Sequence, residues 1–144
     1  MPQAKTTFNG QQFIDALPHC KALGMVPRHF GPGTAEIEMP YNTRLIGDPD
    51  TGVIHGGAVS ALMDTCGGAA ALSHPDAGLS TATLDLRIDY MRPAKPGDAI
   101  VAKAECYHMT RSVAFVRAVA LDSDTDRPVA TATGAFTVSG RPLS

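Results

Sequence analysis

Apolar and polar residues alternate along most of the second half of the chain, which is the pattern of half-buried β-strands. The alternation fills four runs, 82–90, 100–107, 112–121 and 129–138, separated by short connections, of which the first and the last contain Pro and Asp. Closely spaced strands with short turns pair antiparallel. A further run of this kind, 35–39, follows a Gly-Pro-Gly turn and ends at a proline.

The segment 56–72 has a different pattern, because it is apolar on almost every side and contains no proline. This predicts one long helix that is enclosed by the rest of the protein. Residues 9–24 predict a helical lead-in, with Asn9 as its cap and an interruption at Pro18. Residues 41–52 show no period and are rich in Asn, Gly, Asp and Pro, so we expect a loop there.

The order helix, strand, buried helix and four strands indicates an α+β protein in which an antiparallel sheet curls around a single helix. We expect one domain over residues 1–144, with its core in 31–138. One sheet cannot cover the whole helix, and we expect apolar groups such as Val101 and Val116 on the outer face of the sheet. A second copy of the chain is the natural cover, so we expect a homodimer or a homotetramer.

The bulk composition excludes several classes of protein. A chain of 144 residues, 44% hydrophobic and 18% charged, can bury a core without disulfides or metals. A formal net charge of −2 gives no electrostatic case for nucleic acid or for an anionic membrane as partner. The first residues lack the apolar core of a signal peptide, and no stretch reaches the ~18 apolar residues of a membrane span. We therefore expect a cytoplasmic protein.

The cysteines and serines point to neither a metal site nor a serine nucleophile. Cys20, Cys66 and Cys106 are odd in number and widely spaced, so we expect each of them to pack in the core. Ser60 and Ser112 have no obvious His–acid pair. The chain also lacks the glycine-rich loops that cradle phosphates in dinucleotide-binding and P-loop proteins.

The most informative stretch is His55-Gly56-Gly57, where a loop becomes the N-terminus of the long helix. The first N–H groups of a helix lack intrahelical partners, and glycine lets a substrate carbonyl come close. The pair is therefore suited to hold the oxyanion of a tetrahedral intermediate. The alternative is a tight turn without a chemical role. His55 is either catalytic or a structural residue that binds a neighbouring loop.

Asp64 is the only Asp, Glu, Lys or Arg between Thr51 and Pro75. A carboxylate inside an enclosed helix is costly unless it has a partner. This favours a general base or nucleophile that faces a cleft, over a residue that only caps a neighbouring loop. Asp64 lies eight residues after Gly56, roughly 12 Å along a helix. If both act on one substrate, we expect them to meet across a subunit interface.

Thr83 lies on the polar face of the predicted strand 82–90. Its hydroxyl is suited to hold a water molecule or a thioester, although threonine also suits strands for no functional reason.

Three motifs together resemble the hotdog-fold acyl-CoA thioesterases of the phenylacetate-pathway (PaaI-like) type: GVIHGGAVSALMD, LDLRIDYMRPAKPGD and RSVAF. The resemblance runs from about residue 31 to 138, and its most specific part is the HGG with an acid nine residues after the histidine. It implies a five-stranded antiparallel sheet wrapped around a central helix. It also implies a double hotdog of two subunits, and dimers that pair into tetramers.

The resemblance implies roles for individual residues. Asp64 matches the general base or nucleophile that acts on the thioester carbonyl, and Gly56 matches the facing subunit's N–H that polarises it. Thr83 matches a hydroxyl that positions the attacking group. We expect no cofactor besides the coenzyme A of the substrate, and no metal. The residues expected to contact the substrate are Gly57, Tyr90, Arg92, Pro93, Lys95, Thr110, Arg111 and Ser112.

Among these expected contacts, Arg92, Lys95 and Arg111 would supply positive charge to the phosphates of coenzyme A. One departure from the family pattern stands beside them. Many members have an Asn shortly before the HGG, where it orients water or substrate, but here residues 48–52 read Asp-Pro-Asp-Thr-Gly. This departure leaves the details of water activation open, and with them the activity; the candidates to replace the Asn are Asp48 and Asp50.

The sequence thus predicts an acyl-CoA thioesterase that releases a free acid and coenzyme A. One alternative is a non-catalytic acyl-CoA binding protein, which the missing Asn favours. The other is a hotdog-fold enoyl-CoA hydratase or dehydratase, which needs a His and an acid working together. The pattern leaves the acyl group open, because Leu62, Met63 and Leu72 suit aromatic and aliphatic tails equally.

Overall fold

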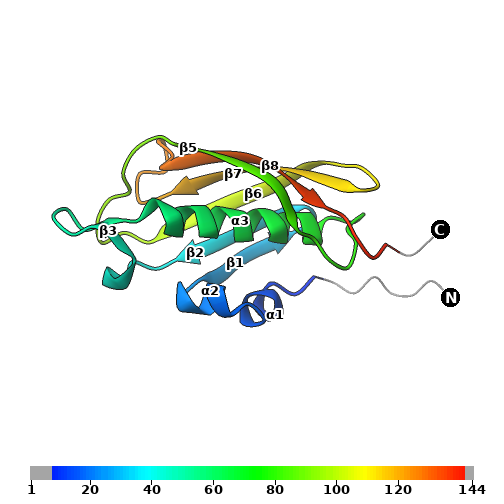
Figure 1. Cartoon of the computed structure of the whole chain (residues 1–144), viewed down its shortest axis with the longest axis horizontal. Coiled ribbons are helices and arrows are strands. Elements are labelled where there is room, and N and C mark those ends of the chain that lie inside the picture. Colours follow the sequence, from blue (N-terminus) through cyan, green and yellow to red (C-terminus); the bar gives the residue numbers. More distant parts are fainter. Residues whose placement is uncertain (1–7, 142–144) are drawn as a thin grey trace.

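A computed structural model describes residues 8–141 and shows a long helix lying across one face of an antiparallel sheet (Figure 1). The sheet has six strands in the order β1-β2-β6-β7-β8-β5. Helix α3, Gly56–Ser73, packs mainly on the central strands β2, β6 and β7. The predicted hotdog arrangement is therefore confirmed. The strands are β1 (Val26–Gly31), β2 (Thr34–Met39), β5 (Thr83–Tyr90), β6 (Ile100–Met109), β7 (Val113–Leu121) and β8 (Ala130–Thr137).

The six-stranded sheet corrects the expectation of five strands. Strand β1 was not predicted, because it is an edge strand that pairs only with β2 and its residues show no alternation of burial. The Gly-Pro-Gly turn at 31–33 is the hairpin between β1 and β2, with Gly33 at a φ of 72°. Glycine adopts this left-handed conformation without the cost that a Cβ brings.

The core lies between α3 and the inner face of the sheet. Leu62, Met63 and Cys66 on α3 are fully buried there. Val116 is only 1% exposed and packs toward Gly67 of α3, so its expected place on the outer face was wrong. Val101, in contrast, is half-buried in β6. All three cysteines are buried and free, as predicted, and burial raises the pKa of the Cys66 thiol to about 12.

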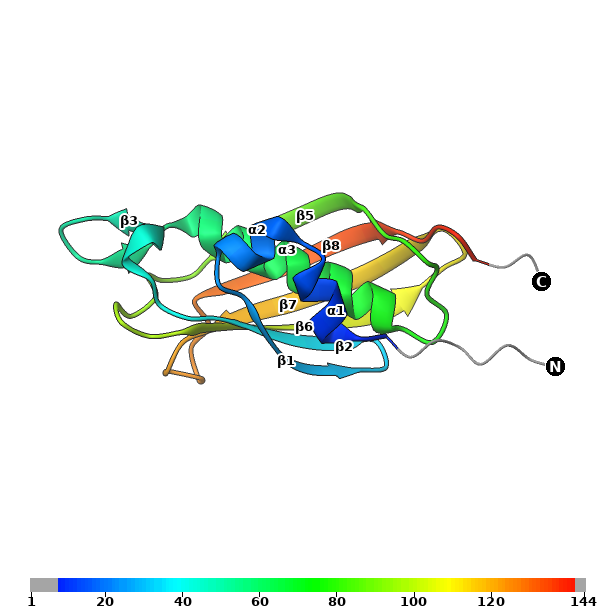
Figure 2. The same cartoon turned by 90° about the horizontal axis from the view of Figure 1, so that it is seen from below.

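The lead-in forms two short helices, α1 (Gly10–Asp15) and α2 (Pro18–Ala22). The predicted cap is confirmed, because the Asn9 side chain accepts a hydrogen bond from the Gln12 N–H at 3.0 Å. Helix α2 lies alongside α3, where the Cys20 thiol contacts the Thr65 hydroxyl at 3.8 Å. Seen from below, α1 and α2 lie over the same face of the sheet as α3 (Figure 2).

The segment 41–52 is more ordered than the predicted loop. It holds a 3₁₀ turn η1 (Thr43–Leu45) and a short strand β3 (Ile46–Asp48), which pairs with β4 (Val53–Ile54). This hairpin extends beyond the sheet at the N-terminal end of α3 (Figures 1 and 2). A Cβ on Gly47 would lie 2.7 Å from the His55 Cα, so only glycine lets the hairpin pack against the start of α3.

Candidate active site

The N-terminus of α3 is capped by a histidine. The Nδ1 atom of His55 accepts a hydrogen bond from the Gly57 N–H at 2.8 Å. Gly57, expected among the substrate contacts, therefore has its N–H engaged within the chain. The Gly56 N–H has no hydrogen-bond partner among residues 8–141. Of the two glycine N–H groups, only that of Gly56 is free to bind a carbonyl oxygen.

This cap also fixes the chemistry of the His55 ring. A neutral imidazole whose Nδ1 accepts a hydrogen bond carries its proton on Nε2. In this state His55 is a donor at Nε2, and its single acceptor nitrogen is already used. The ring therefore has no lone pair available to take a proton from a substrate, so the geometry fits the structural role better than a general base.

Asp64 lies in the middle of α3 and faces the edge strand β5. Its Oδ1 accepts a hydrogen bond from the Thr83 hydroxyl at 2.7 Å. Oδ2 has no partner among the described residues, and the side chain is half-buried. The structure thus brings together two of the predicted site residues, and it leaves one carboxylate oxygen open.

A β-bulge places Thr83 on the face of β5 that meets α3. The Tyr90 hydroxyl also contacts α3, donating to the Gly56 carbonyl at 2.9 Å. In a regular strand, residues seven apart point to opposite faces. The pairing of β5 with β8 shifts register between Thr83 and Asp85, and such a bulge turns one side chain over. The predicted placement of Thr83 on the opposite, polar face was therefore wrong.

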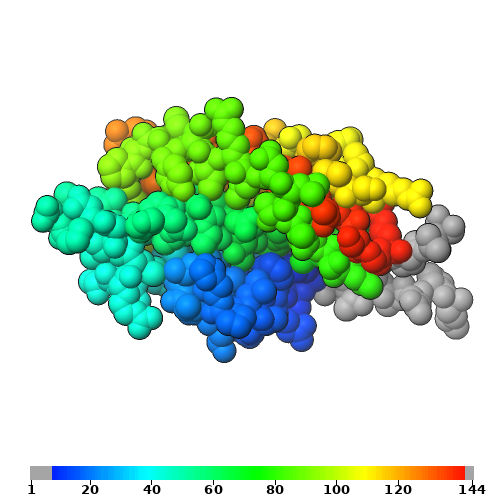
Figure 3. Space-filling view, viewed as in Figure 1, coloured from blue at the N-terminus to red at the C-terminus, as the bar shows by residue number. Residues whose placement is uncertain are grey.

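Asp64 and Gly56 are separated along the same helix by eight residues, which is roughly 12 Å. Between α2 and β5, one side of α3 is left uncovered within the protomer (Figure 3). Gly57 is exposed on α3, and Ser60, Ala61 and Asp64 are half-buried there. The helix is therefore enclosed on the sheet side but open along this strip.

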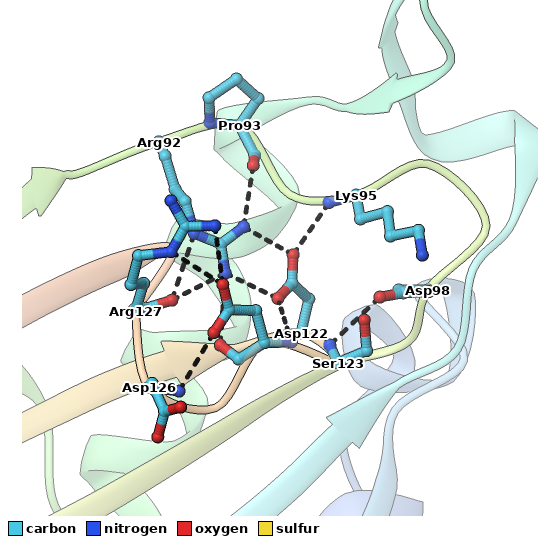
Figure 4. Close-up of polar contacts among 9 residues, drawn as sticks. Arg92, Pro93, Lys95, Asp98, Asp122, Ser123, Asp126 and Arg127 are labelled. Carbon is cyan, nitrogen blue, oxygen red and sulfur yellow. Dashed lines mark hydrogen bonds and ion pairs between the residues drawn. The ribbon is translucent and has the colours of Figure 1, made fainter.

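The charge of Arg92, which was predicted to act at the phosphates, is engaged within the protein. Two of its nitrogens bind the two Asp122 carboxylate oxygens at 2.7 and 2.6 Å (Figure 4). Its Nε and Nη2 donate to the Arg127 carbonyl, and Nη1 also donates to the Pro93 carbonyl. All three guanidinium nitrogens are thus engaged within the protein, and the charge is matched by a buried carboxylate.

Asp122 is the residue at this cluster that the sequence did not single out. Its side chain is 1% exposed. It also accepts the Lys95 and Asp124 backbone N–H groups at 2.9 and 3.0 Å. The Arg92 hydrogen bonds, helped by these N–H donors, hold the pKa of Asp122 well below its usual range. The two loops that carry Arg92 and Asp122 are locked together by these bonds.

Lys95 and Arg111 are exposed, and their side chains make no ion pair among residues 8–141. They lie at opposite ends of β6, Ile100–Met109, which is about 30 Å long at the rise of an antiparallel strand. The structure therefore does not bring these two cations together within one protomer. Thr110 and Ser112 form the turn beside Arg111, where the Ser112 and Val113 N–H groups donate to the Thr110 hydroxyl.

The segment that replaces the family's Asn is organised around Asp48. Its carboxylate accepts the Asp50 N–H at 3.0 Å and the Thr51 hydroxyl at 2.7 Å. The Thr51 hydroxyl, with the Asp50 N–H, lowers the pKa of Asp48. Asp48 thus shapes its own turn, and it is not a free counterpart of the missing amide.

A second feature without a sequence signal is a cavity of about 290 Å³ beside the first turn of α3. Its lining comes from three separate segments, so no local spacing marks it. The residues that line the cavity are His19, Leu23, Arg44, Leu45, Ile46, His55, Gly57 and Ala58.

Within residues 8–141, no cluster of His, Cys, Asp or Glu has the arrangement of a metal site. No helix in that part of the chain is both long and apolar enough to cross a membrane.

Comparison with known proteins adds a family to this geometry. Residues 51–129 match the family model of the thioesterase superfamily, a stretch that includes His55, Asp64, Thr83 and Asp122. A putative esterase of Halobacterium salinarum is 36% identical over 94 residues, which cover 62% of this chain. The chain spans 61% of the length of that relative.

Two further similarities cover more of the chain. The medium/long-chain acyl-CoA thioesterase YigI of Escherichia coli is 26% identical over 142 residues, 90% of each chain. The solved structure of a variant of the phenylacetic acid degradation protein PaaI from Thermus thermophilus is 27% identical, with a TM-score of 0.75. The similarity covers 85% of this chain and 100% of the Thermus thermophilus chain.

Proposed function

The chain belongs to the thioesterase superfamily, and from this premise we propose that it hydrolyses acyl-CoA thioesters to a free acid and coenzyme A. The observation that carries the proposal is the Asp64 carboxylate on α3. It is half-buried, held through one oxygen by Thr83 at 2.7 Å, and open at the other oxygen. The similarity to YigI, named as an acyl-CoA thioesterase, supports coenzyme A as the thiol.

In the proposed reaction, Asp64 activates the attack on the thioester carbonyl. The Thr83 hydroxyl holds Oδ1 and so fixes the orientation of the carboxylate, while Oδ2 faces the substrate. Oδ2 either takes a proton from an attacking water molecule or attacks the carbonyl itself. Either route uses only the substrate, water and side chains of the protein, so the proposal includes no cofactor besides the coenzyme A of the substrate.

The carbonyl oxygen binds the Gly56 N–H at the N-terminus of α3. The free N–H and the helix dipole both stabilise the negative charge that develops on this oxygen. Because Asp64 is roughly 12 Å away along the same helix, the Gly56 that acts with it belongs to a second copy of the chain. The proposal therefore includes a homodimer, with the uncovered strip of α3 and the unpaired edge of β5 as the surfaces that meet.

The geometry of His55 argues against the hydratase alternative. A hydratase pairs a histidine with an acid at the reacting carbon, but the His55 acceptor nitrogen is used by Gly57. Lys95 and Arg111 remain the proposed cations for the phosphates of coenzyme A, since neither has an acidic partner among residues 8–141.

The test is thiol release from a panel of short, long and aromatic acyl-CoAs, with wild-type protein beside Asp64→Asn. We expect turnover in the wild type and a loss of at least ~10²-fold in kcat in the variant, the size expected for a removed general base. Equilibrium binding of the same acyl-CoAs is the control, because Asn keeps the shape of the site. Full activity in the variant would remove Asp64 from the reaction. Binding without turnover in the wild type would instead establish the non-catalytic binding protein.

A further inference from the structure

The cavity beside α3 has two chemically different halves. Leu23, Leu45, Ile46 and Ala58 form its aliphatic part, and all four are buried or half-buried. The other lining side chains, His19, Arg44 and His55, are exposed and carry nitrogen donors. The cavity is therefore apolar inside and cationic or hydrogen-bond donating where it opens.

The donors at this opening have no acid to neutralise them. Among the described residues 8–141, no Asp or Glu lines the cavity. The Arg44 guanidinium makes no ion pair and no hydrogen bond within residues 8–141, whereas its backbone N–H is fixed by Asn42 at 2.9 Å. The 3₁₀ turn thus holds the Arg44 backbone in place and leaves its side chain available for an anion.

The residues on both sides of the proposed carbonyl site, His55 and Gly57, line the cavity. Gly57 lines it, and the neighbouring Gly56 carries the free N–H, about 3.8 Å away between Cα atoms. An acyl group whose carbonyl oxygen binds that N–H therefore has its chain at the mouth of this cavity. At about 290 Å³ the space is at the small end of ligand pockets, which fits a few methylenes and one terminal group.

We propose that this cavity receives the far end of the acyl group, and that Arg44 selects acyl chains that end in a carboxylate. The inference rests on the proposed thioester hydrolysis and names its substrate class, the half-thioesters of short dicarboxylic acids. The methylenes contact Leu23, Leu45 and Ile46. The terminal carboxylate binds the Arg44 guanidinium, with His19 beside it. The aliphatic half of the lining gives a pyrophosphate nothing to bind, so the acyl group fits this cavity better than coenzyme A does.

The test compares two ligands of equal carbon number, hexanoyl-CoA and adipoyl-CoA, with free coenzyme A as the reference. Dissociation constants are measured by calorimetry in the Asp64→Asn background, so that binding does not depend on turnover. We expect adipoyl-CoA to bind about tenfold tighter than hexanoyl-CoA, the size of one charge-assisted hydrogen bond. Adding Arg44→Gln should remove this preference and leave the affinity for hexanoyl-CoA unchanged.

Lys21→Gln is the matched control. Lys21 is an exposed cation on the same helix as His19 but does not line the cavity, so its removal should keep the preference. Equal affinities for the two acyl-CoAs, or a preference that survives Arg44→Gln, would overturn the proposal. An equal loss of affinity for free coenzyme A in Arg44→Gln would overturn it too, by assigning Arg44 to the nucleotide.

Thiol release by the wild-type protein keeps this test separate from that of the proposed function. If no acyl-CoA is turned over but the adipoyl preference depends on Arg44, hydrolysis fails as a function and the cavity assignment is supported. If hexanoyl-CoA and adipoyl-CoA are both hydrolysed but bind equally, hydrolysis is supported and the cavity assignment is overturned.

Discussion

Asp64 and Asp122 are two carboxylates in one small protein, the first half-buried and the second buried, and they have opposite surroundings. Asp122 accepts two hydrogen bonds from Arg92 and two from backbone N–H groups, and its side chain is 1% exposed. Asp64 has one hydrogen bond, from Thr83, and a second oxygen without a partner in the described chain. The Asp122 carboxylate is therefore saturated with hydrogen bonds. The Asp64 carboxylate is oriented by one hydrogen bond and keeps one oxygen free among the described residues.

This difference in hydrogen bonding distinguishes an acid that stabilises the fold from an acid that is able to take part in a reaction. A saturated buried carboxylate fixes two loops in place, and it has no lone pair left for a substrate. An acid with an open oxygen has less stabilisation from the fold and keeps the capacity to bind or move a proton. The saturated carboxylate of Asp122 thus indicates a structural role, and the open oxygen of Asp64 supports the role proposed for it above.

The largest expected effects come from making the same substitution at both positions. Asp64→Asn should lower kcat by at least ~10²-fold with little change in melting temperature, because Asn still accepts the Thr83 hydroxyl. Asp122→Asn should do the reverse, since its NH₂ would face the donors of Arg92 and the Lys95 N–H. We expect its melting temperature to fall by several degrees, with kcat almost unchanged in the folded protein.

Calorimetry and thiol release on the two purified variants check this pair of results. A variant of Asp122 that melts like the wild type would show that the Arg92 cluster contributes no stability. A variant of Asp64 that loses stability as well as activity would place it with Asp122 as a structural acid.

Acid titration sharpens the same contrast. The Arg92 hydrogen bonds lower the pKa of Asp122 in the folded protein, while in the unfolded chain an aspartate titrates near 3.9, roughly. The unfolded state then binds more protons, so the stabilisation is complete above about pH 5 and is lost as the pH falls through and below 4.

We therefore expect the urea midpoint to be flat between about pH 7 and 5 and to fall below about pH 4. In Asp122→Asn this fall should be shallower. It should persist in part, because side-chain hydrogen bonds also lower the pKa values of Asp48, Asp98 and Asp124. An identical pH profile in the variant would show that Asp122 is not the titrating partner.

A smaller effect is expected from the single partner of Asp64. Thr83→Val removes the hydroxyl and keeps the shape, so Asp64 loses its orientation and kcat should fall by roughly tenfold, as for one lost hydrogen bond to a charged group. Thr83→Ser restores the hydroxyl and should restore most of kcat. Steady-state kinetics with one acyl-CoA checks both variants. If serine behaves like valine, Thr83 acts through packing rather than through its hydroxyl.

The fold was largely readable from the chain, because its helix and its central strands have strong periods. The segment 56–72 was predicted as one enclosed helix and forms α3. Strand β1 and the hairpin of β3 and β4 escaped prediction for a common reason. They lie at an edge of the sheet or beyond it, where exposure on both sides erases the alternation that marks a strand.

Site residues could be predicted from the sequence only where the polarity of a residue contrasts with that of its neighbours in the chain. Asp64 stands out as a charge in an apolar helix, whereas Asp122 lies among other acids in a turn and gives no such signal. Thr83 was predicted on the wrong face of its strand because a bulge adds one residue to the strand. The amino-acid composition of the strand gives no sign of such a bulge. The ion pair of Arg92 gave no sequence signal, because its partner Asp122 lies 30 residues away in the chain.

The smallest expected effects are on KM, and they distinguish the exposed cations Lys95 and Arg111 from Arg92, which is paired with Asp122. Arg111→Ala and Lys95→Ala each remove an exposed charge, so each should raise KM by about two- to fivefold, as for one surface ion pair, and leave kcat unchanged. Phosphate contacts bind ground state and transition state alike, which is why the effect falls on KM. The effect on KM should also shrink at high salt, because exposed charges are screened.

Arg92→Lys is the comparison for these two variants, since it keeps a positive charge but cannot form the same fork to Asp122. It should lower the melting temperature and leave KM near the wild-type value. If Arg92→Lys instead raises KM as Arg111→Ala does, the Asp122 pair opens when substrate binds, and Arg92 acts at the phosphates after all. A fall in kcat for Arg111→Ala would place that residue at the reacting carbonyl instead of the nucleotide end.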